Sequence, residues 1–260
     1  FGARIAGPDW SNAAGWGALS HWSSIQLVDL DGDGRADLCG RDADGVVCHL
    51  STGDGFGDAL AGPGWSDVNG WDDWSNASTL RFADLDGDGA QDVCMRANAG
   101  IRCALFEGDG FSAQFDGPGL DDDGSWDLQR FHSTLRLADV TGDGRADLCA
   151  RAWARVRCWP FDEAGFGPSF DGPEWGQTQG WSAPAAYGTI RLVSPPPLPP
   201  AGDDDSADDD DDSAAGDDDD LARPDPGGFA PPPDPGCGCG DGAATGLAFL
   251  PLVLFRRRLT

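Results

Sequence analysis

Three short acidic segments have the residue types and the spacing needed to hold a hard cation. The first, 29–37, reads Asp-Leu-Asp-Gly-Asp-Gly-Arg-Ala-Asp, and it recurs with small changes at 84–92 and 139–147. Carboxylates stand at loop positions 1, 3, 5 and 9, glycine at position 6 permits a sharp turn, and the carbonyl at position 7 offers another oxygen. The predicted calcium ligands are Asp29, Asp31, Asp33, Arg35, Asp37, Asp84, Asp86, Asp88, Ala90, Asp92, Asp139, Thr141, Asp143, Arg145 and Asp147.

A metal-free acidic turn is the alternative interpretation, because Asp and Gly also favour tight turns. Three or four carboxylates within nine residues repel one another unless a cation lies between them. Three copies at constant spacing therefore favour calcium sites. The late glutamate of an EF-hand loop is missing, and Asp37 would take its place. Thr141 replaces a carboxylate at position 3 of the third loop, so we expect that site to be the weakest.

The acidic loops belong to a longer repeat with a constant step of 55 residues. Phe-Gly and Gly-Pro dipeptides recur at this step, and so does a tryptophan column formed by Trp16, Trp71, Trp126 and Trp181. The alignment gives the complete units 16–70, 71–125 and 126–180 and the partial units 1–15 and 181–193. Repeats of roughly this length indicate a solenoid or a propeller.

Each unit is predicted to contain four short strands. One run alternates apolar and polar residues, as a half-buried strand does, at 24–28, 79–83, 134–138 and 189–193. Two further runs flank a turn, at 38–41 with 46–50 and at 93–96 with 101–106. The Phe-Gly run supplies a fourth strand before Gly-Pro ends it, and no stripe of helical period occurs within 1–193. We therefore predict an all-β fold built from propeller-type blades of about 55 residues.

Six of the eight cysteines follow the same repeat. They form the pairs Cys39 with Cys48, Cys94 with Cys103, and Cys149 with Cys158, each nine residues apart across a predicted turn. A hairpin loop of two or four residues places such positions opposite each other, with Cα atoms about 4.5–5.5 Å apart. The spacing predicts three disulfides and hence an oxidising compartment.

The Phe-Gly and Gly-Pro columns, together with Asp-x-Asp-Gly-Asp-Gly-x-x-Asp, resemble the FG-GAP/VCBS repeats that form the blades of integrin-α-like β-propellers. The resemblance covers residues 1–193. It implies a calcium-stabilised propeller, usually extracellular, that serves adhesion, ligand binding or scaffolding. Such propellers usually have about seven blades, whereas three complete and two partial units occur here. We therefore expect the chain to be a piece of a longer array.

The last 67 residues have a different character from the repeats. Residues 194–236 combine Pro runs with Asp blocks, so a disordered, extended linker is expected. Residues 237–260 contain Cys237 and Cys239, a short apolar stretch and an Arg cluster. They resemble the MYXO-CTERM sorting tails of myxobacteria. That resemblance implies export, processing by a membrane protease near the two cysteines, and surface display or secretion; a plain membrane anchor is the alternative.

The composition limits what the chain can bind or catalyse. A net charge of −28 disfavours nucleic acid as a partner, because phosphates would be repelled. The three histidines share no repeat column and no catalytic motif is present, so we expect no enzymatic activity and histidines on strand surfaces. The expected function is binding of an extracellular protein or glycan. A lectin with sugar-stacking tryptophans, or the non-catalytic part of a larger secreted enzyme, are the alternatives.

Overall fold

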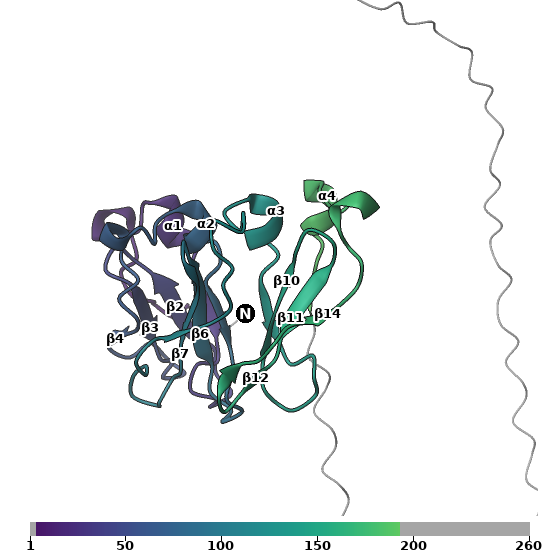
Figure 1. Ribbon diagram of the computed structural model, residues 1–260. Coiled ribbons are helices and arrows are strands. Elements are labelled where there is room, and N and C mark those ends of the chain that lie inside the picture. Colours follow the sequence, from purple (N-terminus) through teal and green to yellow (C-terminus); the bar gives the residue numbers. More distant parts are fainter. Residues whose placement is uncertain (1–3, 193–260) are drawn as a thin grey trace, which may run out of the picture. The chain divides into compact units, whose positions relative to one another are not determined.

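The computed structural model describes residues 4–192, and these residues form a mostly β structure. Each complete unit folds into one four-stranded antiparallel sheet, and the three sheets stand side by side in chain order (Figure 1). The first sheet contains β1 (Gln26–Val28), β2 (Asp37–Arg41), β3 (Val46–His49) and β4 (Leu60–Ala61). The second contains β5 (Arg81–Ala83), β6 (Asp92–Ala97), β7 (Gly100–Ala104) and β8 (Phe115–Asp116). The third contains β9 (Arg136–Ala138), β10 (Asp147–Arg151), β11 (Val156–Trp159) and β14 (Phe170–Asp171).

Short helices that the sequence did not predict precede the first strand of each sheet. The one-turn α-helices are α1 (Leu19–Trp22), α2 (Trp74–Ala77), α3 (Gln129–His132) and α4 (Pro184–Tyr187). The 3-10 turns are η1 (Asn12–Ala14), η2 (Asp67–Asn69) and η3 (Gln177–Gln179). A single turn is too short to display a 3.6-residue period, so the sequence pattern could not reveal it. The α-helices lie along one edge of the sheets (Figure 1).

The predicted strands are largely confirmed, with two corrections. Residues 189–192 form no strand, because the other first strands pair with the strand that follows an acidic loop, and the partial unit contains no such loop. The fourth strand directly precedes Gly-Pro, whereas the phenylalanine of the Phe-Gly dipeptide lies in a separate pairing. Phe56 and Phe111 form isolated bridges, and the third unit contains β12 (Phe161–Asp162) paired with β13 (Gly165–Phe166).

The three predicted disulfides are present. They join Cys39 to Cys48, Cys94 to Cys103, and Cys149 to Cys158, with Cα atoms 4.1 Å apart in each pair. The paired cysteines lie directly opposite each other in the antiparallel register of the two central strands. The hairpin loops between these strands hold four residues in the first and third sheets and two in the second, as the nine-residue spacing requires.

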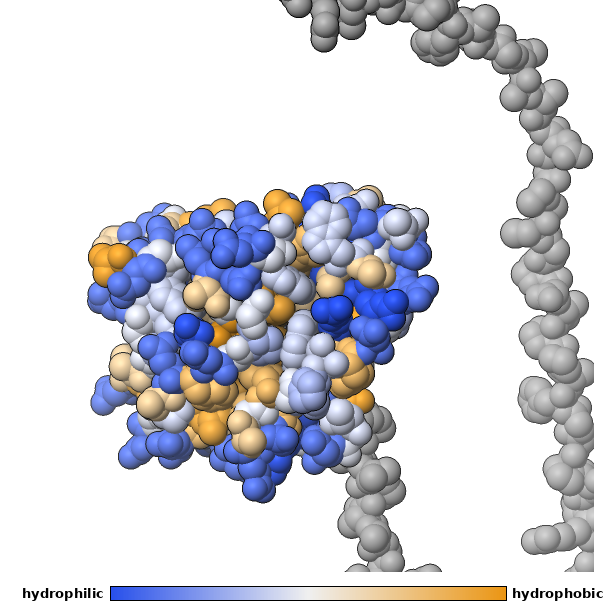
Figure 2. Space-filling view, in the orientation of Figure 1, coloured by the Kyte–Doolittle hydropathy of each residue, from blue (hydrophilic) through white to orange (hydrophobic). Residues whose placement is uncertain are grey.

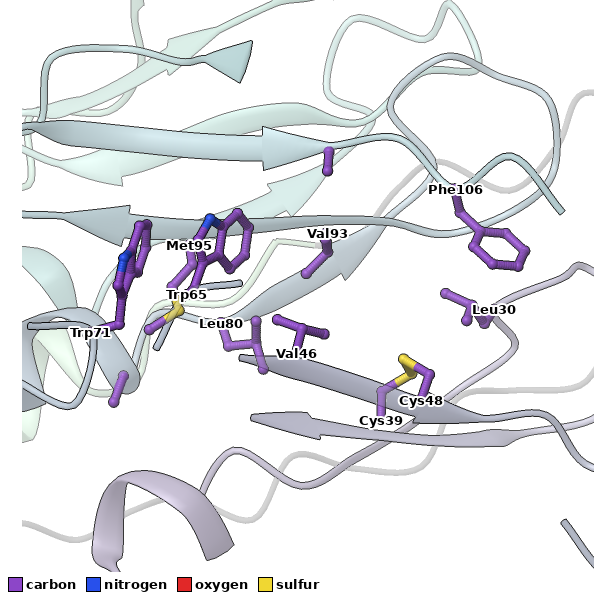
Figure 3. Close-up of a cluster of buried hydrophobic side chains, with 12 residues drawn as sticks. Leu30, Cys39, Val46, Cys48, Trp65, Trp71, Leu80, Val93, Met95 and Phe106 are labelled. Atoms are coloured by element: carbon purple, nitrogen blue, oxygen red, sulfur yellow. A yellow bond between two sulfur atoms is a disulfide. The ribbon is translucent and has the colours of Figure 1, made fainter. Parts of the chain in front are cut away.

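The core consists of side chains packed between neighbouring sheets. Between the first and second sheets, the Cys39–Cys48 disulfide, Val46 and Leu30 pack against residues of the second unit that include Val93 and Phe106 (Figure 3). A corresponding cluster fills the space between the second and third sheets. Outside these layers the visible face is mostly hydrophilic, with small separate hydrophobic patches (Figure 2). Each sheet therefore depends on its neighbour for burial, as in other repeat proteins.

Tryptophans of the repeat column serve this packing. Trp71 stacks on Trp65 with ring centroids 4.9 Å apart, and both are buried between sheets (Figure 3). Trp16 stacks on Trp10 at 4.1 Å, and Trp181 on Trp175 at 4.5 Å. Near the boundary of the second and third units, Leu120 replaces the first tryptophan of the pair, and Trp126 packs against Phe131 instead. These contacts favour a packing role for the column over the sugar-stacking alternative.

Candidate metal centres

Each acidic loop connects the first and second strands of a sheet, and its last aspartate begins the second strand. Asp37, Asp92 and Asp147 are at most 1% exposed. The two carboxylate oxygens of Asp92 accept hydrogen bonds from the backbone N–H of Leu85 at 2.7 Å and of Phe106 at 2.8 Å. Asp37 and Asp147 accept equivalent pairs of bonds. This aspartate therefore fixes the start of the loop to the segment that follows the third strand.

The first aspartate of each loop accepts hydrogen bonds from glycine N–H groups within the loop. Asp84 accepts from Gly87 at 2.6 Å and from Gly89 at 3.0 Å, and Asp139 makes the same two contacts in the third loop. Gly87 and Gly89 have φ angles of 83° and 94°. Other residues rarely adopt this left-handed conformation, which explains the Gly-Asp-Gly pattern.

In two of the loops, three of the four predicted carboxylate ligands bring their oxygens close together. Oxygens of Asp29, Asp31 and Asp37 lie within 4.8 Å of one another, and so do those of the second loop's Asp84, Asp86 and Asp88. The Oδ1 atom of Asp29 is buried without a hydrogen-bond donor. A hard divalent cation takes oxygen ligands. The convergent carboxylate oxygens, together with the Asp29 oxygen that accepts no hydrogen bond, fit such an ion.

The two clusters differ at loop positions 5 and 9, since the first includes Asp37 whereas the second includes Asp88 and leaves out the predicted ligand Asp92. In the first loop, the Arg35 side chain forms an ion pair with Asp33, and Asp33 does not join the cluster. The second loop has Ala90 in place of this arginine, at position 7, and Asp88 lies with Asp84 and Asp86. The sequence predicts only the backbone carbonyl of position 7 as a calcium ligand. It does not reveal that the Arg35 side chain would compete with a cation for the Asp33 carboxylate.

The third loop departs further from the predicted ligand set. Thr141 donates its backbone N–H to Asp147 at 3.0 Å. Arg145 reaches back to the second loop, where its Nε donates to the Asp86 carbonyl at 3.2 Å. Asp143 accepts the backbone N–H of Arg145 at 3.0 Å. Among the described residues, groups of three convergent acidic side chains occur in the first two loops and not in this one.

Consecutive loops also pack against each other. The N–H of Gln91 donates to the Leu30 carbonyl at 2.8 Å, and the N–H of Ala146 donates to the Asp84 carbonyl at 2.7 Å. A Cβ atom on Gly32 would lie 2.7 Å from the Gly89 carbonyl oxygen, so only glycine fits there. The loops thus form one continuous row, and a change in one loop reaches the next through backbone contacts.

Burial and mutual repulsion raise the pKa of three loop carboxyls. Desolvation raises the pKa of Asp92 to about 7, with a smaller contribution from Asp86 and Asp84. Desolvation also raises the pKa of Asp37 and of Asp84, again with neighbouring aspartates adding to the shift. A bound cation would act in the opposite direction, because it favours the ionised carboxylates.

This shift predicts how the stability of the metal-free protein depends on pH. The folded-state pKa of Asp92, about 7, exceeds the ordinary aspartate value of 3.8, so folding favours the protonated form. The resulting stabilisation is fully present below about pH 4 and is lost as pH rises towards 7. In excess chelator, the melting temperature is therefore expected to be higher at pH 5 than at pH 7.5. Asp92→Asn should weaken this dependence; an equal dependence in both proteins would contradict the assignment.

Comparison with known proteins supports the repeat assignment. Residues 84–150 match the FG-GAP-like repeat family. This FG-GAP-like segment contains the second acidic loop, the second disulfide and the third loop. A comparison with curated proteins gave no match.

Several solved structures resemble the fold. An Agrocybe aegerita lectin, described as recognising non-reducing terminal N-acetylglucosamine, is 26% identical with a TM-score of 0.59; the alignment covers 68% of this chain and 44% of the lectin. The Photorhabdus luminescens Tc holotoxin pore is 23% identical over 58% of this chain and 7% of its own, with a TM-score of 0.41. A TcdB2–TccC3 structure is 28% identical over 49% of this chain and 6% of its own, with a TM-score of 0.35. This chain thus spans less than half of each matched structure.

Two of the three histidines are not the strand-surface residues that the sequence suggested, whereas the third, His49, ends strand β3 and is partly exposed. His21 and His132 lie in α1 and α3 and are 4% and 2% exposed. The Nε2 atom of His21 lies 3.0 Å from Asp67. Nδ1 of His132 lies 3.2 Å from the Ser78 hydroxyl, which donates to the Trp74 carbonyl at 2.6 Å. Desolvation lowers the pKa of His132 to about 4, so it is neutral near pH 7. Helix packing buries these residues, and a strand pattern could not foresee it.

The predicted linker 194–236 and sorting tail 237–260, including Cys237 and Cys239, lie outside the described residues. Within 4–192, no helix has the length and the apolar character needed to cross a membrane.

Proposed function

We propose that this protein is a calcium-binding, surface-displayed repeat module that binds an extracellular protein or glycan and has no catalytic activity. In this proposal the three sheets are blades of a β-propeller. Calcium ions held by the acidic loops fix the loop row between neighbouring blades. The convergence of three carboxylates in each of the first two loops, with the buried Oδ1 atom of Asp29 lacking a donor, is the observation that supports calcium most directly.

Calcium suits these loops better than magnesium does. Calcium accepts six to eight oxygens in flexible geometry, whereas magnesium requires a tight octahedral shell and keeps several waters. Each loop offers carboxylates from a nine-residue turn that is itself shaped by Asp-to-backbone hydrogen bonds. The second loop is proposed to be the stronger site. Position 7 of this loop is Ala90, so no arginine at that position competes with calcium for the Asp88 carboxylate.

Export and surface attachment belong to the same proposal. Three disulfides require an oxidising compartment to persist. Processing near Cys237 and Cys239 by a membrane sorting protease would place the repeats on the cell surface or release them. Mass spectrometry of the surface protein should then show that Arg256–Arg258 have been removed, whereas an intact C-terminus would favour a plain anchor.

Calcium should stabilise the folded protein. A ligand that binds only the folded state adds about 2.7 kcal/mol per site at a hundredfold excess over Kd. Extracellular calcium modules commonly bind at about 10⁻⁴–10⁻³ M, so millimolar calcium should give a smaller but measurable gain. The melting temperature of the full chain is expected to fall when calcium is replaced by chelator, and magnesium should restore little of it. Identical melting temperatures in calcium and in chelator would mean that the loops are acidic turns that bind no calcium.

The residue at loop position 7 offers a matched pair of variants. Arg35→Ala should free Asp33 from its ion pair and strengthen calcium binding by the first loop. Ala90→Arg should do the reverse in the second loop, where Asp88 now lies in the carboxylate cluster. We expect changes of up to about fivefold in the calcium Kd, since a partly exposed ion pair contributes up to about 1 kcal/mol. Calorimetric titration of each variant measures this; unchanged affinities in both would contradict the competition.

Glycan binding is a second candidate, favoured by the similarity to the Agrocybe aegerita lectin. Trp22, Trp74 and Trp153 are 53%, 42% and 54% exposed, and their rings are available to stack on sugars. The test is binding of the full chain to glycans that end in N-acetylglucosamine. Loss of that binding in single alanine variants of the exposed tryptophans would support a lectin, and no binding to any glycan would favour a protein ligand.

A further inference from the structure

One fully buried arginine recurs at the same place in every sheet. Arg41 and Arg151 end the second strand of their sheets, Arg96 is the last residue but one of its strand, and each is 0% exposed. Arginine stays protonated in proteins, so a buried guanidinium needs a compensating anion or a full set of hydrogen-bond acceptors. The three copies differ in whether a carboxylate compensates the charge.

In the first two units a carboxylate from the following 3-10 region or turn compensates the charge. Arg41 Nη1 lies 2.8 Å from Asp67. Arg96 forms an ion pair with Asp122, and its Nη1 also donates to the side chains of Asn76 at 2.7 Å and Ser75 at 3.0 Å. Arg41 keeps Nε and Nη2 without acceptors, but Asp67 still balances its charge.

The third unit lacks this compensation. At the 55-residue step, Gln177 replaces Asp122, Arg130 replaces Ser75, and Phe131 replaces Asn76. Arg151 donates only to backbone carbonyls, that of Trp175 at 2.8 Å and that of Arg130 at 3.3 Å. No ion pair between a carboxylate and Arg151 or Arg130 occurs among the described residues.

Instead, two guanidinium groups lie close to one phenyl ring. The Cζ atoms of Arg130 and Arg151 are 5.2 Å and 5.5 Å from the ring centroid of Phe131, and Arg130 is also 5.4 Å from the Trp153 ring. Burial and, after it, the charge of Arg130 lower the pKa of Arg151. Cation–π contacts contribute less than an ion pair between buried groups and do not neutralise the charge.

Three buried donors at this place have no acceptor: Nε of Arg130, Nη2 of Arg151 and Nε2 of Gln177. Arg151 is itself fully buried. An anion with two oxygens would accept from such donors and balance one of the two positive charges, as Asp122 does for Arg96. We propose that Arg130, Arg151 and Gln177 form a binding site for a carboxylate group.

The surroundings of the site indicate how the carboxylate is reached and what it is attached to. Arg130 is half-buried, and the neighbouring Trp153 is 54% exposed, so the approach from solvent passes beside these two residues. The indole of Trp153 offers an apolar face for the ring of an acidic sugar. The site does not depend on calcium or on the proposed function.

The experiment is a titration of the full chain with glucuronate, with glucose at matched ionic strength as the neutral control. We expect glucuronate, and not glucose, to raise the melting temperature. Gln177→Asp places a carboxylate of the protein beside Arg151. This substitution should therefore raise the melting temperature without glucuronate and abolish the response to glucuronate. Arg130→Ser introduces the residue of the second unit and should weaken binding about tenfold or more, as loss of a charge-assisted hydrogen bond predicts.

The proposal is overturned if the full chain does not respond to glucuronate, or if Gln177→Asp binds it as tightly as the unaltered chain does. Because calcium is held constant throughout, failure here is separate from failure of the calcium sites.

Discussion

Asp92→Ala is expected to lower the free energy of unfolding by about 2–5 kcal/mol. The Asp92 side chain is 0% exposed and accepts the backbone N–H groups of Leu85 and Phe106. Alanine leaves both donors buried without an acceptor, and each such donor costs about 1–3 kcal/mol. Urea unfolding of the full chain, in calcium and in chelator, measures the change.

Two further variants separate the structural and the electrostatic roles of this side chain. Asp92→Asn keeps one acceptor oxygen and nearly the same shape, so it should destabilise less than alanine while reducing the calcium response. Asp88→Ala removes an exposed carboxylate of the same loop and should affect calcium binding with little change of stability in chelator. If Asp92→Ala unfolds at the same urea concentration as the unaltered protein, the aspartate does not hold the loop.

Trp65→Ala is expected to destabilise the protein by about 3–5 kcal/mol, the range for truncation of a large buried aromatic side chain. Trp65 is 1% exposed, stacks on Trp71 and donates its indole N–H to the Gln114 side chain at 2.9 Å. Its removal leaves a cavity between the first and second sheets, where Met95 and Leu80 also lie (Figure 3). Chemical denaturation followed by tryptophan fluorescence measures the loss.

Trp22→Ala is the matched control, because the Trp22 side chain is 53% exposed and lies outside the core clusters. It should change the free energy of unfolding by less than about 0.5 kcal/mol. Equal effects of the two substitutions would mean that the Trp65–Trp71 stack does not connect the sheets. Because neighbouring sheets share one core, Trp65→Ala should also broaden the unfolding transition if the units then unfold separately.

The local features of the fold were predictable from the sequence because the repeat displays them three times. The 55-residue columns gave the unit boundaries, the alternating runs gave the strands, and the nine-residue cysteine spacing gave the hairpin register and the disulfides. Each depends on short-range geometry, such as the two-residue period of a strand. The convergence of Asp29, Asp31 and Asp37 was predictable for the same reason, since the ligands lie within nine residues.

Contacts between units were decided by the tertiary structure alone. The contact of Arg145 with the second loop lies between units, and it changes the predicted ligand set of the third loop. The ion pair of Arg35 with Asp33 lies within one loop, but it too depends on side-chain directions that spacing does not fix. The four-residue helices stayed hidden because one turn has no period.

The buried arginines show the same limit most clearly. In the sequence, Arg151 is one of seventeen arginines. The structure shows that Arg96 pairs with Asp122 and that Gln177 takes the place of this carboxylate beside Arg151. The sequence thus determined the repeat, the hairpins and the acidic loops, because these follow from neighbours along the chain. Burial and pairing of charges arise between residues about 20–60 positions apart, so only the packed sheets decided them.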